Sequence, residues 1–105
     1  MPAGQIAVLY ARIMARPPRP SPRELAPGWP AVEAVDPVGE VARRFAQNVA
    51  AAIGERSVRA VAKEIGVDHT TILSLLAGRA WPDLATIAKL ELGLGVDLWP
   101  GRSRD

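Results

Sequence analysis

Residues 57–78, SVRAVAKEIGVDHTTILSLLAG, contain two short helical patterns that are joined by a turn around one glycine. Ser57 and Asp68 are residue types that begin helices, and Gly66 and Gly78 are the type that ends them. The junction between the two patterns is too short to let two helices lie antiparallel. We therefore expect two short helices that cross at a steep angle, with Gly66 at positive φ.

The same arrangement of cap, apolar stripe and glycine occurs on both sides of this stretch. Asp36 followed by Pro37 predicts the start of a longer helix that ends at Gly54. Asp83 and Gly95 predict the two ends of a last helix. Apolar residues at helical spacing predict the inward faces of these two helices: Val38, Val41, Ala42, Phe45, Val49, Ala52 and Ile53, then Leu84, Ile87, Ala88, Leu90 and Leu94.

These patterns together predict an all-α domain of four or five short helices over residues 37–100. No strand pattern of comparable strength occurs in the sequence. Trp81 is expected to plug the space between two helices, and Trp99 to do the same at the end of an apolar hook. Residues 101–105 read as a polar tail.

Residues 1–36 differ from the rest in composition. Residues 16–37 hold seven prolines, at positions 17, 18, 20, 22, 27, 30 and 37, which predicts an extended linker or arm. Before it, Ile6, Leu9, Tyr10, Ile13 and Met14 recur at helical spacing, which favours a short helix over about 5–15, although the same residue types suit a strand. We expect this piece to dock on the domain or on a second copy. We expect Trp29 to pack against the domain or a partner.

The composition limits the chemistry that this chain offers. Its 105 residues suit one domain, 49% of them are hydrophobic, and the formal net charge is +2. The chain has no cysteine, and His69 is its single histidine, so we predict no metal site and no cofactor. The sequence contains no catalytic triad and no glycine-rich phosphate loop, so we predict no enzyme activity. The apolar N-terminal run is too short to span a bilayer, so we expect a soluble, cytoplasmic protein with no membrane partner.

Residues 57–100 resemble the Cro and lambda-repressor class of regulators, also called the XRE type. Counting Val58 as the first position of the helix-turn-helix motif, five positions carry the residue types that the motif uses: Ala62, Gly66, Val67, Ile72 and Leu75. Gly78, the Pro82–Asp83 junction and the final LGVDLWP also resemble the family. Residues 1–36 carry no resemblance to a known family.

This resemblance implies that the helix over 68–78 lies in the major groove of DNA. It assigns base contacts to His69, Thr70, Leu73, Ser74 and Ala77. It assigns phosphate contacts to Ser57, Arg59, Lys63, Thr71 and Arg79, with Arg56 as a further candidate. Arg43 and Arg44 are instead expected to be solvated or paired with Glu40.

We therefore predict a sequence-specific, double-stranded DNA-binding transcriptional regulator of the phage Cro or repressor type, from a bacterium or a bacteriophage. It would bind an operator as a homodimer, with residues 5–15 as the candidate dimer contact, in the cytoplasm at the nucleoid. An alternative is an antitoxin or a helix-turn-helix adaptor that mainly binds a protein partner, such as a toxin. The arginine-rich half of the linker would either enter a minor groove or form a solvated tether.

Overall fold

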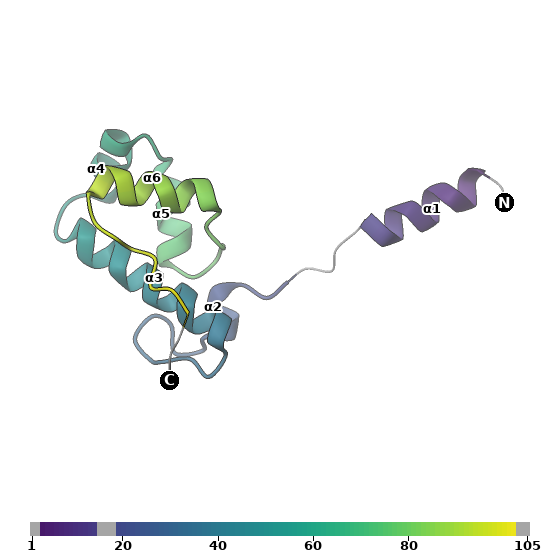
Figure 1. Ribbon diagram of the computed structural model, residues 1–105, viewed down its shortest axis with the longest axis horizontal. Coiled ribbons are helices and arrows are strands. Elements are labelled where there is room, and N and C mark those ends of the chain that lie inside the picture. Colours follow the sequence, from purple (N-terminus) through teal and green to yellow (C-terminus); the bar gives the residue numbers. More distant parts are fainter. Residues whose placement is uncertain (1–2, 15–18, 103–105) are drawn as a thin grey trace.

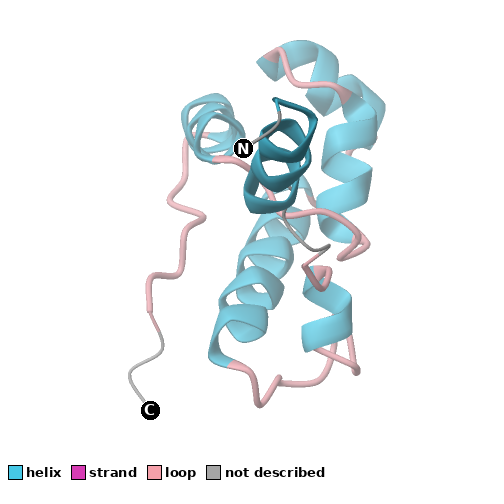
Figure 2. Cartoon of the chain, turned by 90° about the vertical axis from the view of Figure 1, so that its right-hand side faces the viewer, coloured by secondary structure: helices cyan, strands magenta, loops and turns pink. Residues whose placement is uncertain are grey.

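The fold is entirely helical in the part of the chain that the structure describes. The computed structural model describes residues 3–14 and 19–102, without the side chains of 10–14. Its helices are α1 (Ala3–Met14), α2 (Pro22–Leu25), α3 (Pro37–Ile53), α4 (Val58–Ile65), α5 (His69–Leu76) and α6 (Leu84–Leu94). Helices α2 to α6 gather into one body, and α1 lies apart from them (Figure 1). The described part of the chain consists of helices and loops (Figure 2). The predicted all-α class is confirmed, and α2 is an additional helix.

Local sequence signals set the ends of α3 to α6. Each of these helices begins after a side chain that accepts a hydrogen bond from a first-turn amide: Asp36 from Gly39, Ser57 from Ala60, Asp68 from Thr70, and Asp83 from Thr86, at 2.8, 3.2, 2.9 and 2.7 Å. Gly54, Gly66 and Gly95 end three of them with φ of 64°, 76° and 71°. These hydrogen bonds and backbone angles confirm the predicted helix starts and ends.

Helices α3, α4, α5 and α6 share one apolar core with the segment after α6. Its buried members are Phe45, Val49, Ile53, Val61, Ala62, Ile72, Leu75, Leu90 and Leu98. Leu98 belongs to the predicted hook, which three hydrogen bonds hold in place, one of them from the Trp99 amide to Glu91 Oε2 at 3.0 Å. The Leu98 carbonyl accepts from Asn48 Nδ2 at 2.8 Å, and its amide donates to Glu91 Oε2 at 2.7 Å.

Four residues that were expected to face the core are exposed instead. Val38, Leu84 and Trp99 are 60%, 80% and 53% exposed, and Ala88 is exposed as well. At the start of α3 the inward positions are Gly39 and Glu40, because a glycine lets α2 approach closely. In α6 the core face contains Leu90, and the exposed residues lie on the opposite side. Trp99 still contacts Phe45, with ring centroids 6.4 Å apart.

The predicted extended linker is wrong for the described part of residues 16–37. Ser21 and Glu24 form a capping box that starts α2, and this turn packs against α3. Pro22 is fully buried, and Ala26 is 0% exposed. A Cβ on Gly39 would lie 2.7 Å from the Cβ of Leu25, so α2 and α3 are in close contact. Proline at the first helical positions is compatible with a helix, which is why this proline-rich segment folds. Residues 15–18 and 103–105 of the predicted helix, linker and tail lie outside the described residues.

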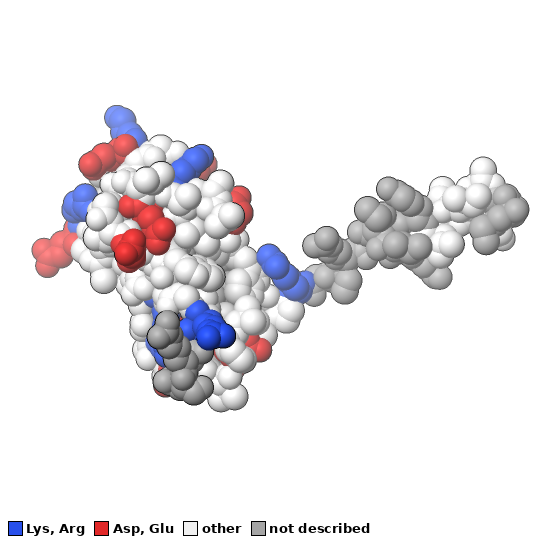
Figure 3. All heavy atoms as spheres, viewed as in Figure 1, with Lys and Arg blue, Asp and Glu red and all other residues white. Residues whose placement is uncertain are grey.

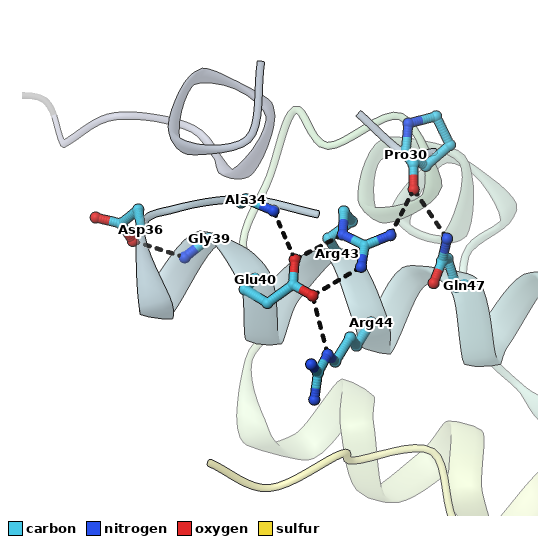
Figure 4. Close-up of polar contacts among 8 residues, drawn as sticks. All are labelled: Pro30, Ala34, Asp36, Gly39, Glu40, Arg43, Arg44 and Gln47. Atoms are coloured by element: carbon cyan, nitrogen blue, oxygen red, sulfur yellow. Dashed lines mark hydrogen bonds and ion pairs between the residues drawn. The ribbon is translucent and has the colours of Figure 1, made fainter. Parts of the chain in front are cut away.

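A buried carboxylate ties this N-terminal segment to α3 (Figure 4). Glu40 is 3% exposed, and it accepts from Arg43 Nε at 2.7 Å, Arg44 Nε at 2.9 Å and the Ala34 amide at 2.8 Å. The hydrogen bond from Arg43 is the main reason that the pKa of Glu40 falls to about 2. The predicted pairing of Arg43 and Arg44 with Glu40 is confirmed. Arg43 also donates to the Pro30 carbonyl at 3.0 Å, so the pair fixes the chain before α3.

Helix α1 makes little contact with the other helices (Figure 1). The helical interpretation of this segment is confirmed, and the strand alternative is wrong. Ile6, Val8 and Leu9 are 52%, 61% and 48% exposed, so these described apolar side chains of α1 are not buried against its own domain. Docking on a second copy stays a prediction.

Candidate nucleic-acid interface

The turn between α4 and α5 depends on the backbone of Gly66. Its φ of 76° and ψ of 32° are left-handed, a conformation that side-chain-bearing residues adopt at a cost. The amides of Gly66 and Val67 both donate to the Ala62 carbonyl, at 2.9 and 3.1 Å, and close α4. Asp68 follows at once and caps α5. The chain therefore leaves α4 and enters α5 in a new direction with almost no intervening loop.

The inward side of α5 is held by two buried side chains. Ile72 and Leu75 are 0% and 3% exposed, and they belong to the same core cluster as Val61 of α4 and Leu90 of α6. The five residues expected at the core of the motif all lie at this junction: Ala62, Gly66, Val67, Ile72 and Leu75. Because α5 is anchored along one side, its opposite side has a fixed orientation relative to the rest of the domain.

The outward side of α5 carries the residues that were expected to face DNA bases: His69, Thr70, Leu73, Ser74 and Ala77. Leu73 is 42% exposed, Thr70 is also exposed, and the other three are half-buried. Their spacing puts them on one side of the helix, away from Ile72 and Leu75. The structure thus brings these candidates together on one accessible face.

A carboxylate lies at the first turn of this face. Asp68 Oδ1 accepts from the Thr70 amide at 2.9 Å and from the Thr70 hydroxyl at 2.8 Å. The bond from the amide is the largest cause that lowers the pKa of Asp68, so this group is ionised at neutral pH. Because the Thr70 hydroxyl already donates, its oxygen is left as a hydrogen-bond acceptor. The sequence indicated Asp68 only as a cap and missed this effect on its neighbour.

The candidates for phosphate contact lie before, within and after α5 in the chain: Ser57, Arg59, Lys63, Thr71 and Arg79. Arg59, Lys63 and Arg79 are exposed, Thr71 is half-buried, and the Ser57 hydroxyl accepts from the Ala60 amide. Arg56 differs from these, because it donates to the carbonyls of Ala52 and Ile53 at 3.2 and 3.3 Å. Its guanidinium therefore caps the end of α3.

A shallow pocket lies beside the outward face of α5. It is lined by Thr70, Thr71, Ser74, Leu75, Ala80, Trp81 and Pro82. Trp81 is half-buried at this wall, and its Nε1 donates to the Pro20 carbonyl at 2.9 Å. The expectation that Trp81 plugs the core between two helices is therefore wrong, because the indole N–H turns toward the N-terminal segment.

Sequence reasoning also missed what lies at the other end of α5. The Trp29 indole Nε1 donates to the Leu76 carbonyl at 2.9 Å, and the Arg23 amide donates to the Gly78 carbonyl at 2.9 Å. These bonds satisfy carbonyls that the end of a helix leaves without partners. A tryptophan within a proline-rich stretch was the only sequence signal, and the expected packing of Trp29 against the domain is confirmed.

Charge on the visible side of the molecule is mixed (Figure 3). Acidic and basic side chains alternate over α6 and the segment after it, and they form no single basic patch on that side. Among residues 3–14 and 19–102, no group of His, Cys, Asp or Glu side chains could hold a metal ion. No helix in the described ranges is both long and apolar enough to cross a membrane.

Helices α4 and α5 with their tight turn, braced by α3 and α6, define a helix-turn-helix domain. A family model described as Helix-turn-helix matches residues 54–98, which span α4, α5 and α6. The match covers less than half of the chain, and it supports the likeness of residues 54–98 to the Cro and lambda-repressor class of regulators, the XRE type. No curated protein and no solved structure gives a significant match to the chain.

Proposed function

We propose that this protein is a sequence-specific transcriptional regulator of the phage Cro or repressor type, which reads the major groove of an operator with α5. The observation that carries the proposal is the two-sided character of α5. Ile72 and Leu75 anchor one side in the core, while Thr70 and Leu73 are exposed on the other. A major groove about 12 Å wide accepts one such helix.

The proposed base contacts follow from the chemistry of this face. His69 donates to a purine acceptor, the Thr70 and Ser74 hydroxyls form hydrogen bonds with base edges, and Leu73 packs on a thymine methyl group, with Ala77 at the edge of the contact. The exposed Arg59, Lys63 and Arg79, together with Ser57 and Thr71, contact phosphates and set the register of the helix on the duplex. These phosphate contacts add affinity that falls as salt is raised.

A gel-shift titration tests the reading role of α5. DNA from upstream of the protein's own gene is compared with scrambled DNA of the same length. The test variant combines His69→Ala, Thr70→Ala and Ser74→Ala, and circular dichroism checks that it folds. The control combines Lys89→Ala and Asp97→Ala, which are exposed positions outside the proposed interface and leave the net charge unchanged.

We expect the triple variant to lose preference for the upstream DNA, while the control keeps it. A good bidentate base contact discriminates by about 1–3 kcal/mol, and because three side chains are truncated together the loss should exceed ten-fold. If the folded triple variant binds the operator as tightly as the wild type, α5 is not the reading helix. If the wild type binds no DNA even at low salt, the regulator proposal is wrong.

We further propose that the protein binds its operator as a homodimer, with α1 as the dimer contact. The support is the exposed apolar surface of Ile6, Val8 and Leu9 on a helix that its own domain leaves uncovered. Sedimentation of a variant that lacks residues 1–15 tests this proposal without removing the packed segment that begins at Ser21. A variant that still forms dimers would exclude α1 as the contact.

The same exposed helix supports the second candidate function, an antitoxin or adaptor that binds a protein partner. Salt dependence separates the two: an apolar protein interface is nearly insensitive to salt, whereas binding to phosphates weakens steeply. A wild type that is monomeric in sedimentation and captures a toxin encoded beside its gene through α1 would favour this alternative.

A further inference from the structure

The end of α5 is enclosed by a segment that precedes the helix-turn-helix domain in the chain. We call residues 19–30 the N-terminal clamp. Trp29 Nε1 donates to the Leu76 carbonyl and the Arg23 amide to the Gly78 carbonyl, both at 2.9 Å. From the other direction, Trp81 Nε1 donates to the Pro20 carbonyl at 2.9 Å. Three hydrogen bonds therefore link the clamp to the last turn of α5 and the loop that follows.

Packing makes the contact close as well as polar. Gly78 is buried, and a Cβ placed on it would lie 2.7 Å from Trp29 Cε2 and 2.8 Å from the Arg23 Cβ. The Arg19 guanidinium lies 5.4 Å from the ring centroid of Trp81, within range of a cation–π contact. The end of α5 is thus held between a tryptophan and the backbone of the clamp.

The clamp is itself firmly attached to the domain. Pro22 and Ala26 are buried, and the Pro30 carbonyl accepts from Arg43 Nη1 at 3.0 Å and from Gln47 Nε2 at 2.9 Å. Both donors lie on α3. The clamp therefore connects α3, on one side of the domain, to the far end of α5.

Helix α5 has eight residues, which is too short to be stable or to keep its direction without tertiary contacts. Its first turn is fixed by Asp68, and its middle is fixed by Ile72 and Leu75. Its last turn is fixed by the clamp. We propose that the N-terminal clamp positions α5 for DNA reading, with Trp29 as the main positioning residue. This inference rests on the proposed function of α5.

The assignment separates two kinds of DNA binding. Base contacts need α5 at a defined angle in the groove, whereas phosphate contacts from α4 tolerate small rotations of α5. Loss of the clamp should therefore reduce the preference for the operator more than it reduces binding to scrambled DNA. A residue with a merely structural role would lower both affinities by the same factor, through the fraction of folded protein.

The test variant is Trp29→Phe in the full chain, which keeps an aromatic ring and removes the N–H donor. Trp81→Phe removes the hydrogen bond from Trp81 Nε1 to the Pro20 carbonyl, and it is the variant to test if Trp29→Phe does not fold. Trp99→Phe is the matched control, because Trp99 is 53% exposed and contacts Phe45 of α3 instead of α5. Each variant is examined by amide hydrogen exchange and by titration with operator and scrambled DNA.

We expect exchange at Ala77, Gly78 and Arg79 to accelerate about five-fold in Trp29→Phe, which is the equilibrium factor of one ordinary hydrogen bond. Exchange in α3 should stay at the wild-type rate. The ratio of the operator to the scrambled affinity should fall by a similar factor, and Trp99→Phe should change neither quantity.

Wild-type exchange and a wild-type affinity ratio in both clamp variants would overturn the proposal. An equal loss of operator and scrambled binding, in step with a lower melting temperature, would reduce the clamp to a structural element and also overturn it. If the wild type shows no sequence preference, the proposed function fails and the reading role fails with it. The exchange measurement, which needs no DNA, still tests the physical contact in that case.

Discussion

Replacing Glu40 with glutamine removes the charge that holds the N-terminal segment on α3. The carboxylate is 3% exposed and accepts bonds from Arg43, Arg44 and the Ala34 amide. A pKa lowered from 4.5 to about 2 corresponds to roughly 3 kcal/mol of stabilisation. Because the Arg44 side chain is 36% exposed, solvent screens part of this, and we expect Glu40→Gln to lower the free energy of unfolding by about 2 kcal/mol at pH 7.

The dependence of this loss on pH has a definite sign. The folded pKa of Glu40, about 2, lies below its value in the unfolded chain, about 4.5. The stabilising contribution is therefore complete above about pH 4.5 and disappears as the pH falls toward 2. The wild type and the variant should differ by about 2 kcal/mol from pH 7 to pH 5, and the two should converge between pH 4.5 and 2.

Urea unfolding followed by circular dichroism measures this difference at each pH, and urea leaves the ionic strength unchanged. Glu55→Gln is the matched control, because Glu55 is an exposed carboxyl group in the turn after α3. It should change the free energy of unfolding by less than about 0.5 kcal/mol. A Glu40→Gln effect that is just as small, or one that stays constant down to pH 2.5, would refute the reasoning.

Three further outcomes are expected. Gly78→Ala should lower the free energy of unfolding in urea by about 2 kcal/mol or more, because its φ is 72° and the new Cβ would meet the clamp tryptophan. Gly95→Ala, at φ 71° in open space, should lower it by about 1 kcal/mol, and equal losses would contradict the steric argument. Ile72→Val should lower the free energy of unfolding by about 1 kcal/mol and the melting temperature with it, while Leu73→Ala should leave both nearly unchanged. The reverse order would mean that the two sides of α5 are misassigned. Arg59→Ala should weaken binding to operator and scrambled DNA alike and reduce the slope of log affinity against log salt by about 0.9, and an unchanged slope would remove Arg59 from the phosphate contacts.

Local chemistry made most of the helical framework predictable. A capping side chain, an apolar stripe and a terminal glycine act within a few residues, so Asp36, Ser57, Asp68 and Asp83 indicated the correct helix starts. The residues of the outward face of α5 were instead implied by the resemblance to the Cro and lambda-repressor class. Whether its residues contact bases stays a prediction, because that depends on DNA.

Features that depend on distant parts of the chain were not predictable in the same way. Prolines in residues 16–37 indicated an extended linker, but Pro22 is buried because α2 finds a partner in α3. The pairing of Glu40 with Arg43 was expected from their spacing, but its burial and the hydrogen bond from the Ala34 amide depend on the fold of the segment before α3. Val38 has the correct spacing for the core, but the glycine beside it lets α2 take that place.

The bonds of the clamp also bear on the order in which the molecule folds. Trp29 and Leu76 are 47 positions apart, and Trp81 and Pro20 are 61 apart, so each bond closes a long loop. Closing a long loop lowers the conformational entropy of the chain before the contact at its ends stabilises the fold. The turn between α4 and α5 joins residues that are close in sequence, so its closure costs less entropy. We expect α4 and α5 to form early and the clamp to close last. On a growing chain, residues 19–30 are made long before Trp81, so α5 would acquire its final direction only after residue 81 has been added.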